Sequence, residues 1–410
     1  MKQKQILILG AGYAGMMAAL RLAGKTKKQN VLITLLNDSD HFVERPRLHE
    51  VAAGNAPSQR PLSHMLRDTP IQFRQGQVTA IDANGRSVQC QTHSGPETIT
   101  YDYLIYALGS RVNVDSVAGV REHTYTLEAS GALAAKPLHE GLQTAAPQSH
   151  IVIVGSGPTG IEIAGEIRDA FPKLSVKMVT QGQFAAFTVE RVKRYIREAV
   201  GRLGIEVREG VTVTAVHAHT LHTSQGDIPF DICIWAGGFA GLPLARQAGI
   251  QVNHHNQILV DPALRSLSHP AIYAVGDAAQ PVQPVGAPMR MSLFTALVTA
   301  AHTADNLARR LKGKRERPLG FSTYGQGIAI GQHDAIGFNT YPNDKPIGPL
   351  ITGKTGLIIR NFFVRLLLNM LEIERQWPGF FFWPGKWRGW RGKVKDGRET
   401  AVTPPIQPSV

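Results

Sequence analysis

The chain has 410 residues, of which 43% are hydrophobic and 18% charged, the balance of a folded protein of two or three domains rather than a disordered chain. Its only two cysteines, Cys90 and Cys233, exclude a disulfide framework and a cysteine-rich zinc site, and no apolar run reaches the roughly 18 residues of a membrane span. A formal net charge of +13 raises the question of an anionic partner, either nucleic acid or a membrane surface.

The first predicted element is a strand that breaks into a glycine-rich turn and a helix. Residues 5–15 read QILILGAGYAG and carry Gly10, Gly12 and Gly15. In this pattern the first glycine permits a tight turn, the second admits a pyrophosphate, and the third lets the helix pack on the strand.

Since the apolar run at the N-terminus is too short for a secretory signal, we expect a cytoplasmic protein.

A second strand is predicted at 31–38, VLITLLND, and its end should reach the ribose of a bound dinucleotide. The position at which a ribose-binding acid is expected falls at Asn37 or Asp38. Asp38 is one residue late for the usual register, so Asn37 is the candidate as a neutral donor and acceptor. Strands follow at 76–82 and 101–110, and the latter ends at Gly109, where the backbone passes close to a ligand.

The glycine-rich pattern occurs a second time in the chain. Residues 150–160 read HIVIVGSGPTG, with Gly155, Gly157 and Gly160, and a helical run follows. One such match is weak evidence, but two, each between a strand and a helix, predict two dinucleotides. The next strand, 176–180, ends at Thr180, which offers neither the acid that would favour NADH nor an arginine for NADPH, so the choice stays open.

Two more buried strands end in glycine. The segment 231–238, DICIWAGG, ends in Gly237 and Gly238, and 271–279, AIYAVGDAA, ends in Gly276 and Asp277. Asp277 therefore lies at the carboxyl end of a strand and before an apolar helix, where it is placed to bond a hydroxylated ligand.

The last sixty residues carry much of the excess charge. They hold ten Lys and Arg against four Asp and Glu, and four of the five tryptophans. On a helical wheel the helix near 357–377 has a polar half with Arg360 and Arg365 and an apolar half with Phe362 and Phe363. No nucleic-acid motif accompanies these residues, so the sequence favours a membrane surface. The alternative is a helix packed on its own protein or in a homodimer. If the membrane interpretation holds, 353–410 should be removable without loss of the cofactor.

In this order the segments resemble the two-dinucleotide-binding flavoprotein oxidoreductases, and within them the type II NADH dehydrogenases, from about residue 4 to about residue 376. The resemblance implies an α/β fold of two Rossmann-like domains with a membrane-associating α+β extension at the C-terminus. FAD would bind to a domain made of 1–113 and 263–317, and NADH or NADPH to 114–262. Residues 318–410 would form the C-terminal domain.

The resemblance also implies the site residues. HFVERPRLHEVAAG, 41–54, would cover the flavin, and Glu162 would stand near nicotinamide and flavin, where it orients the ring or relays a proton. The alternative for Glu162 is an acid that complements the helix dipole. The cofactor-binding residues would be Gly10, Gly12, Ala14, Gly15, Asn37, Asp38, Arg45, Val78, Ala107, Gly109, Gly155, Gly157, Thr159, Gly160, Thr180, Gly237, Gly276, Asp277 and Met291.

Quinone is the usual acceptor in that family, and here the chain departs from the pattern. Phe294 and Val298 stand where relatives have the glutamines near the quinone ring, which leaves an apolar pocket with fewer donors. His302, on the same helix, is expected to be solvated. The two cysteines lie in unrelated segments, so disulfide reductases and sulfide:quinone reductases fit poorly.

Three hypotheses follow. The first is an FAD-dependent NAD(P)H:quinone oxidoreductase that pumps no protons and lies on the inner face of the cell membrane. The second is a soluble NAD(P)H-dependent flavin oxidoreductase with another small acceptor or a redox protein. The third is a flavin-bearing binding protein without turnover. No metal is expected in any of them.

Overall fold

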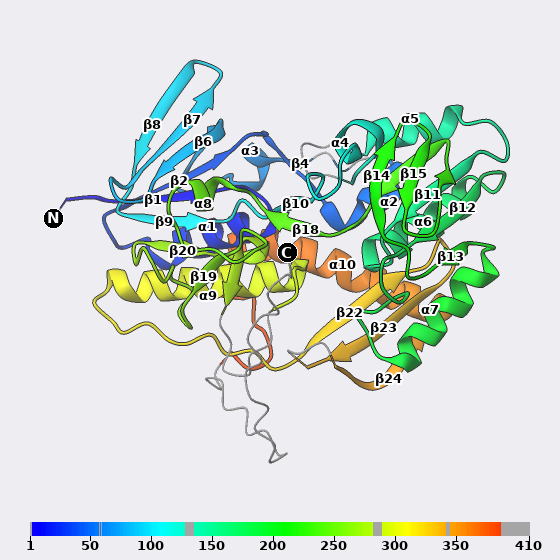
Figure 1. The fold of residues 1–410 in the computed structure, drawn as a ribbon. Coiled ribbons are helices and arrows are strands. Elements are labelled where there is room, and N and C mark those ends of the chain that lie inside the picture. The colour runs from blue at the N-terminus through cyan, green and yellow to red at the C-terminus, as the bar shows by residue number, and fades with distance from the viewer. Residues whose placement is uncertain are drawn as a thin grey trace, which may run out of the picture.

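The computed structural model describes residues 2–56, 58, 60–127, 135–281, 289–341 and 345–386. Two parallel sheets, each flanked by helices, occupy opposite sides of the view in Figure 1, and an antiparallel sheet near the C-terminus lies below the second. The predicted α/β fold with two Rossmann-like sheets is confirmed, whereas the predicted domain boundaries stay predictions.

The first sheet has five parallel strands in the order β20-β9-β1-β2-β5, so a strand from late in the chain completes one edge. The strands are β1 (Lys4–Leu9), β2 (Val31–Asn37), β5 (Ile71–Gln75), β9 (Tyr103–Tyr106) and β20 (Ile272–Ala274).

Both faces of this sheet are buried, which explains the continuous apolar runs. Ile6 and Ile8 pack under the helices α1 (Tyr13–Lys25) and α9 (Leu293–Leu311). Leu7 and Leu9 point to the other face, against an antiparallel sheet. Its strands are β6 (Gln77–Asp82), β7 (Ser87–Thr92) and β8 (Gly95–Thr100).

The second sheet repeats this arrangement. Ile151 and Ile153 face the helices, while Val152 and Val154 face a small antiparallel sheet. The parallel strands, in the order β13-β12-β11-β17, are β11 (His150–Val154), β12 (Ser175–Val179), β13 (Glu206–Arg208) and β17 (Ile232–Trp235). The helices are α5 (Lys136–Thr144), α6 (Pro158–Ala170) and α7 (Glu190–Arg202), and the antiparallel strands are β14 (Val213–His217), β15 (Thr220–Thr223) and β16 (Ile228–Pro229).

Short elements connect the two units. The strands β10 (Ser110–Val112) and β18 (Phe239–Gly241) pair where the chain passes between them. The others are β3 (His41–Phe42), β4 (Arg60–Pro61), β19 (Ile258–Val260), β21 (Ala279–Pro281), the 3-10 helices η1 (Arg45–Arg47) and η2 (Gly276–Ala278), and the helices α2 (Leu48–Ala52), α3 (Leu62–Met65), α4 (Val120–His123) and α8 (Leu244–Gln247).

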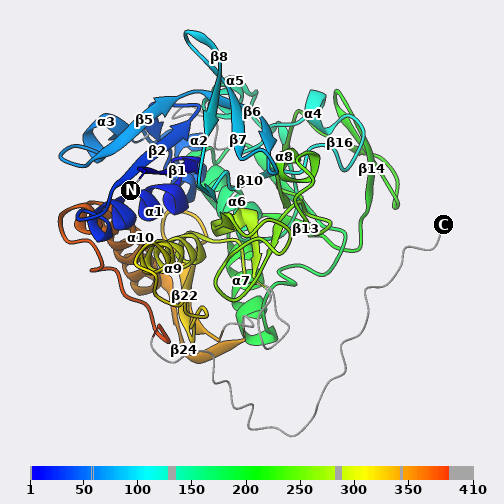
Figure 2. The same cartoon turned by 90° about the vertical axis from the view of Figure 1, so that its left-hand side faces the viewer.

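The C-terminal part comprises three antiparallel strands and the long helix α10 (Gly353–Gln376). The strands are β22 (Tyr324–Ala329), β23 (Ala335–Thr340) and β24 (Pro346–Thr352). Helix α10 packs on α1 and β23, and Figure 2 shows it grouped with α1 and α9. Among the described helices, none combines the length and apolarity that a membrane crossing requires.

The outward side of α10 is only partly the predicted apolar half. Phe362 and Phe363 are 60% and 53% exposed, whereas Leu371 of the same predicted half is buried. Arg360, predicted on the polar side, is 7% exposed because its counter-charge lies inside the protein. The expectation that Arg360 lies on an outward polar side is therefore wrong.

The segment after α10 is also tied to the protein. Trp383 is fully buried in the core shared by α1 and α9, and its indole Nε1 donates to the Gly320 carbonyl at 2.7 Å. Lys386 lies 3.0 Å from Asp305. Removing 353–410 would therefore open this core, contrary to the sequence expectation. The predicted cations and tryptophans beyond 386 lie outside the described residues.

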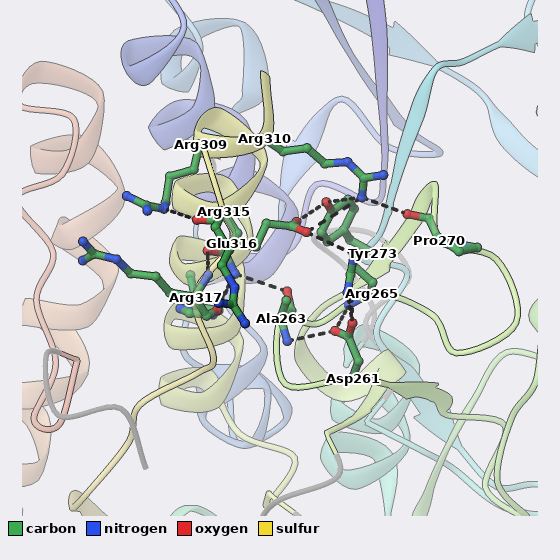
Figure 3. A network of polar contacts seen from close by, with 12 residues as sticks. Asp261, Ala263, Arg265, Pro270, Tyr273, Arg309, Arg310, Arg315, Glu316 and Arg317 are labelled. Carbon is green, nitrogen blue, oxygen red and sulfur yellow. Dashed lines mark hydrogen bonds and ion pairs between the residues drawn. The ribbon is translucent and has the colours of Figure 1, made fainter. Parts of the chain in front are cut away.

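A polar network holds the C-terminal end of α9 against the edge strand β20 (Figure 3). Arg265 binds Asp261 at 2.6 Å and Glu316 at 3.2 Å. Tyr273 on β20 donates to Glu316 and accepts from Arg310 at 3.2 Å. The network therefore covers an edge of the first sheet with the loop that follows α9.

His302 was expected to be solvated, and the structure buries it. Its Nε2 lies 3.0 Å from the Arg317 carbonyl and 3.0 Å from the Asn306 amide, and the ring meets Trp383 edge-on. Burial lowers the pKa of His302 to about 4. The side chain is therefore neutral at physiological pH and acts as a packing and hydrogen-bonding group.

Candidate functional site

The first glycine-rich turn forms an open cradle between β1 and α1. Gly10 has φ +92°, and a Cβ there would lie 2.6 Å from the Ala107 carbonyl oxygen. A Cβ on Gly15 would lie 1.7 Å from the Gly10 oxygen, so this position closes the turn onto the helix. A Cβ on Gly12, in contrast, would meet no other part of the protein within 4 Å. The backbone there is open to a pyrophosphate at the N-terminus of α1, as FAD requires.

The second turn reproduces the same three environments between β11 and α6. Gly155 has φ +114° and stands against the Ala236 carbonyl oxygen, 2.5 Å from an added Cβ. A Cβ on Gly160 would lie 2.1 Å from the Gly155 oxygen, and a Cβ on Gly157 would again point into open space. Two cradles of equal geometry, one on each parallel sheet, match two dinucleotides.

Asn37 lies at the end of β2 beside the first turn, and the protein itself uses both ends of its amide. Its Oδ1 accepts from the Ala11 backbone N–H at 2.8 Å, and its Nδ2 donates to the Ser39 carbonyl at 2.8 Å. Each end keeps one further hydrogen-bonding position for a ribose. Asp38 is exposed. Asn37 therefore fixes the turn, which the sequence did not indicate.

Asp277 meets two other predicted segments at the carboxyl end of the first sheet. Its Oδ2 accepts from the Ser110 hydroxyl at 2.7 Å and lies 3.7 Å from Arg45. Arg45 also donates to the Ser110 carbonyl at 3.1 Å, beside Gly109 with φ +69°. A carboxylate here, with a second oxygen not held by these groups, is suited to bind ligand hydroxyls.

Gly276 connects the loop after β20 with α9 and α1. Its N–H donates to the Thr299 hydroxyl at 2.9 Å, and a Cβ on it would lie 3.1 Å from that of Ala14. Ser110 and Thr299 were missed by the sequence analysis, because a single hydroxyl on a strand or helix carries no pattern.

The remaining predicted cofactor residues lie partly in the first unit and partly in the second. Ala107 is buried against the first turn, and Met291 lies half-buried just before α9. Val78 on β6 is half-buried opposite Cys90. In the second unit Thr159 lies in the first turn of α6, and Gly237 stands against the Trp235 ring. Their contact with a cofactor stays a prediction.

Thr180 directly follows β12, which ends one residue earlier than predicted, and its hydroxyl accepts from the Ser156 hydroxyl at 3.0 Å. Ser156 belongs to the second glycine-rich turn, so this bond connects the turn to the strand end where a ribose would lie. The side chain is half-buried and uncharged.

Glu162 lies in an ionic cluster between α6, α2 and α10. Its Oε1 is 3.0 Å from Arg360 Nη2 and accepts from the Ala329 N–H at 3.2 Å. The first turn of α6 contains no acid, so the helix-dipole alternative for Glu162 does not hold. Arg360 also reaches Glu50 at 3.4 Å. The sequence could not reveal that Arg360 binds Glu162, because 198 positions separate the two residues.

His49, from the segment predicted to cover the flavin, completes the cluster. It is 3% exposed, its Nδ1 lies 3.9 Å from Glu162 Oε2, and its Nε2 lies 3.4 Å from Arg360 Nη2. Burial, with the charge of Arg360, lowers the pKa of His49, although Glu162 opposes this. The ring is therefore a neutral group against the glutamate.

The two predicted acceptor residues lie on one turn of α9 in different surroundings. Phe294 is half-buried among aromatic rings, with Tyr324 stacked at 6.2 Å and Phe321 at 6.1 Å. Val298 is fully enclosed in the core. Phe294 is thus the better placed to border a ligand, and a contact at Val298 stays a prediction.

The cysteines lie in different cores. Cys90 packs with the first sheet and Cys233 with the second, and both are free and buried. Burial raises the pKa of Cys90 and raises that of Cys233 to about 12. Both thiols are therefore protonated and poor nucleophiles.

Comparisons with known proteins agree with this geometry. A family model described as pyridine nucleotide-disulphide oxidoreductase matches residues 4–304. The demethylphylloquinone reductase NdbB of Synechocystis is 27% identical over 350 residues, which cover 81% of this chain and 86% of that protein. A type II NADH:quinone oxidoreductase of Staphylococcus saprophyticus is 24% identical over 367 residues, covering 82% and 89%.

Solved structures share the fold at lower identity. NDH2 from Plasmodium falciparum, in complex with NADH, has a TM-score of 0.75 at 17% identity and covers 92% of this chain and 99% of its own. The sulfide:quinone oxidoreductase of Aquifex aeolicus has a TM-score of 0.77 at 20% identity, with coverage of 92% and 93%. The fold alone therefore does not separate these reductases.

Proposed function

Because the chain belongs to the pyridine nucleotide-disulphide oxidoreductase family, whose members use FAD and NAD(P)H, we propose that it oxidises NAD(P)H through FAD and reduces a quinone without pumping protons. The observation that carries the proposal is the pair of equivalent glycine cradles on the two parallel sheets. One cradle suits the pyrophosphate of FAD and the other that of the nicotinamide nucleotide.

The first unit supplies the residues that would hold FAD. The open backbone at Gly12 would receive the pyrophosphate, and Asn37 would reach the adenosine ribose with its remaining hydrogen-bonding positions. Asp277, fixed by Ser110, would accept from hydroxyls of the ribityl chain. When bound, FAD supplies the chemistry of accepting hydride and passing electrons on, and the protein supplies position and charge.

In the second unit, Gly157 and Thr180 would receive the nicotinamide nucleotide. Glu162 lies on the helix that begins at the second turn and is held by Arg360 and faced by His49. Its charge and fixed direction suit a group that orients the nicotinamide ring or passes a proton.

An external acceptor is favoured by the chemistry of the thiols. Since Cys90 and Cys233 lie in separate cores with raised pKa values, they cannot act as a redox pair. The names of the two relatives both state a quinone as acceptor or substrate. The aromatic surroundings of Phe294 suit a flat apolar ring, although they provide few donors for its oxygens.

A peripheral position on an anionic membrane completes the proposal. Trp377 and Phe380, 62% and 58% exposed, follow α10, and Pro378 between them packs on Gly24 of α1. Lys25 lies next to these rings, since a Cβ on Gly379 would be 2.8 Å from its Nζ, and Lys312 donates to the Lys25 carbonyl at 3.2 Å. Exposed lysines stand at 27, 28, 312 and 314. Aromatic rings next to cations suit the headgroup layer. Ile358, Phe362 and Phe363 of α10 are exposed as well and add apolar area to this surface.

Anaerobic mixing tests the proposal in two steps. NADH or NADPH should bleach the flavin absorbance of the purified protein, and a menaquinone or ubiquinone analogue should then restore it at a rate that supports turnover. Bleaching that only ferricyanide or a redox protein reverses would reject quinone as acceptor. A flavin that neither nucleotide bleaches would reject the oxidoreductase mechanism in favour of a binding protein.

A further inference from the structure

A pocket of about 260 Å³ lies beside the ionic cluster of Glu162. Four segments line it, namely 47–55, α6, the turn between β22 and β23, and α10. This volume is sufficient for several water molecules. Its charged walls are Arg47, Glu50, Glu166, Arg360 and Arg365, and Gln332 is among its neutral polar residues.

Glu166 is the wall residue that also belongs to the helix of Glu162. It comes one turn later on α6, so the two Cβ atoms lie about 5–6 Å apart on the same side of the helix. Its side chain is 5% exposed, yet it borders the pocket. One or two waters can bridge such a distance between carboxyl groups.

The charges around Glu166 come from all the packed elements. Glu50 on α2 and Asp169 on α6 are negative. Arg47 on η1 and Arg360 and Arg365 on α10 are positive. Burial, and next the charge of Glu50, raise the pKa of Glu166 to about 7, while Gln332 and Arg360 oppose this. The group is therefore able to take up and release protons near neutral pH.

Arg360 connects this pocket with the predicted reaction centre. One nitrogen of its guanidinium lies 3.0 Å from Glu162 and another lies 3.4 Å from Glu50. Arginine keeps its proton, so it cannot relay one itself. It instead fixes the two carboxylates at the inner end of the pocket.

The reaction needs a proton from solvent. NAD(P)H delivers a hydride, which is two electrons and one proton, whereas a quinone takes up two electrons and two protons to become a quinol. One proton per turnover must therefore enter from water. The described residues of the pocket offer one carboxyl group, Glu166, that is buried, borders water-sized space and is one helical turn from Glu162.

We propose that Glu166 takes a proton from water in this pocket and passes it to Glu162, supplying the solvent proton that quinone reduction consumes. This inference rests on the proposed function, because it assigns a route to a proton that only a proton-consuming acceptor requires. Glu166 acts through Glu162 and does not itself touch the substrate.

Glu166→Gln tests the route, since it keeps the shape and removes the titrating group. We expect the wild-type quinone rate to decline above pH about 7. The holoenzyme variant should reduce a quinone analogue about tenfold more slowly at pH 7 and lack this decline. Ferricyanide takes electrons without protons, so its reduction should stay within about twofold of the wild type. Glu166→Asp should restore part of the quinone rate, and Glu198→Gln, an exposed carboxylate on α7, should change nothing.

Two readouts do not depend on turnover rate alone. Infrared spectroscopy between pH 5 and pH 9 should show a protonated carboxyl band that titrates near pH 7 in the wild type and is missing in Glu166→Gln. Imidazole, a small proton carrier, should raise the quinone rate of Glu166→Gln but not that of the wild type.

The outcomes separate the two proposals. An infrared band that persists in Glu166→Gln, or a quinone rate and pH profile equal to those of the wild type, would overturn the route. Equal slowing of quinone and ferricyanide would also overturn it, because the defect would then precede the proton. If NAD(P)H bleaches the flavin of the wild type but no quinone reoxidises it, the proposed quinone reductase function is rejected, whatever the Glu166 variants show.

Discussion

Arg21 binds helix α1 to the C-terminal segment inside the protein, where we expect the largest effect of a single charge on stability. It is fully buried, and it forms two bonds to Asp305, at 2.8 and 3.0 Å. It also contacts Glu374 at 3.2 Å and donates to the Phe381 carbonyl at 3.0 Å. Glu374 is fully buried as well and accepts from the Phe381 N–H at 2.9 Å.

Arg21→Met keeps the length of the side chain but leaves the Glu374 carboxylate in the core without its cation. Breaking a buried pair in this way costs about 3–5 kcal/mol of unfolding free energy. Glu374→Gln should cost less, about 1–3 kcal/mol, because Arg21 keeps both bonds to Asp305. The double variant removes both charges of the pair, so its loss should be about 2 kcal/mol smaller than the sum of the single losses.

Urea unfolding of the holoprotein, followed by tryptophan fluorescence, measures these differences. Acrylamide quenching adds a local readout, since the fully buried Trp383 should become accessible in Arg21→Met before the rest of the chain unfolds. Lys25→Met is the matched control, because its nitrogen is 3.8 Å from the same Asp305 but its side chain is 38% exposed. Equal midpoints for Arg21→Met and the wild type, or strictly additive losses in the double variant, would refute the reasoning.

Three further predictions concern the cofactors and the membrane. Asp277→Ala should weaken FAD binding about 10- to 100-fold by removing a charged acceptor, measured as flavin content after dialysis with Ser110→Ala as the weaker control. Thr180→Glu should shift preference toward NADH by repelling a 2′-phosphate, while the wild type discriminates less than roughly a hundredfold; an unchanged ratio of kcat/KM values would show that the position is misassigned. Phe362→Ser with Phe363→Ser should reduce sedimentation with anionic vesicles without lowering stability, because both rings are more than half exposed. A wild type that stays in the supernatant at low salt would reject the membrane surface.

Local signals predicted the two cradles well. Gly15 and Gly160 are required by the carbonyl groups of Gly10 and Gly155, which belong to the same strand-turn-helix units, so the local pattern in the sequence contains this constraint. The strands around them were likewise predictable, because runs such as ILIL are buried on both faces of a parallel sheet.

Contacts between distant segments could not be predicted in this way. A helical wheel assigns Arg360 to a polar side, and polar sides usually face water. The wheel contains no information on Glu162, which supplies the counter-charge from another helix. The same holds for Arg21 and Glu374, separated by 353 positions, and for Trp383, whose burial depends on the space between α1 and α9. Glu166 gave no signal, since one acid in a helix is ordinary.

The late return of β20 to the first sheet has a consequence for how the chain is made. Residues 107–271 separate β9 from its neighbour β20, and helix α9, which covers α1, is made later still. At about 5–20 residues per second, the ribosome needs roughly 10–30 s to synthesise that stretch. During this interval β9 has an unpaired edge and α1 an uncovered apolar side, and the second sheet receives all its strands before β20 is made. The nucleotide unit in the middle of the chain therefore completes before the unit that begins it, and the first glycine cradle becomes a finished binding site only near the end of translation.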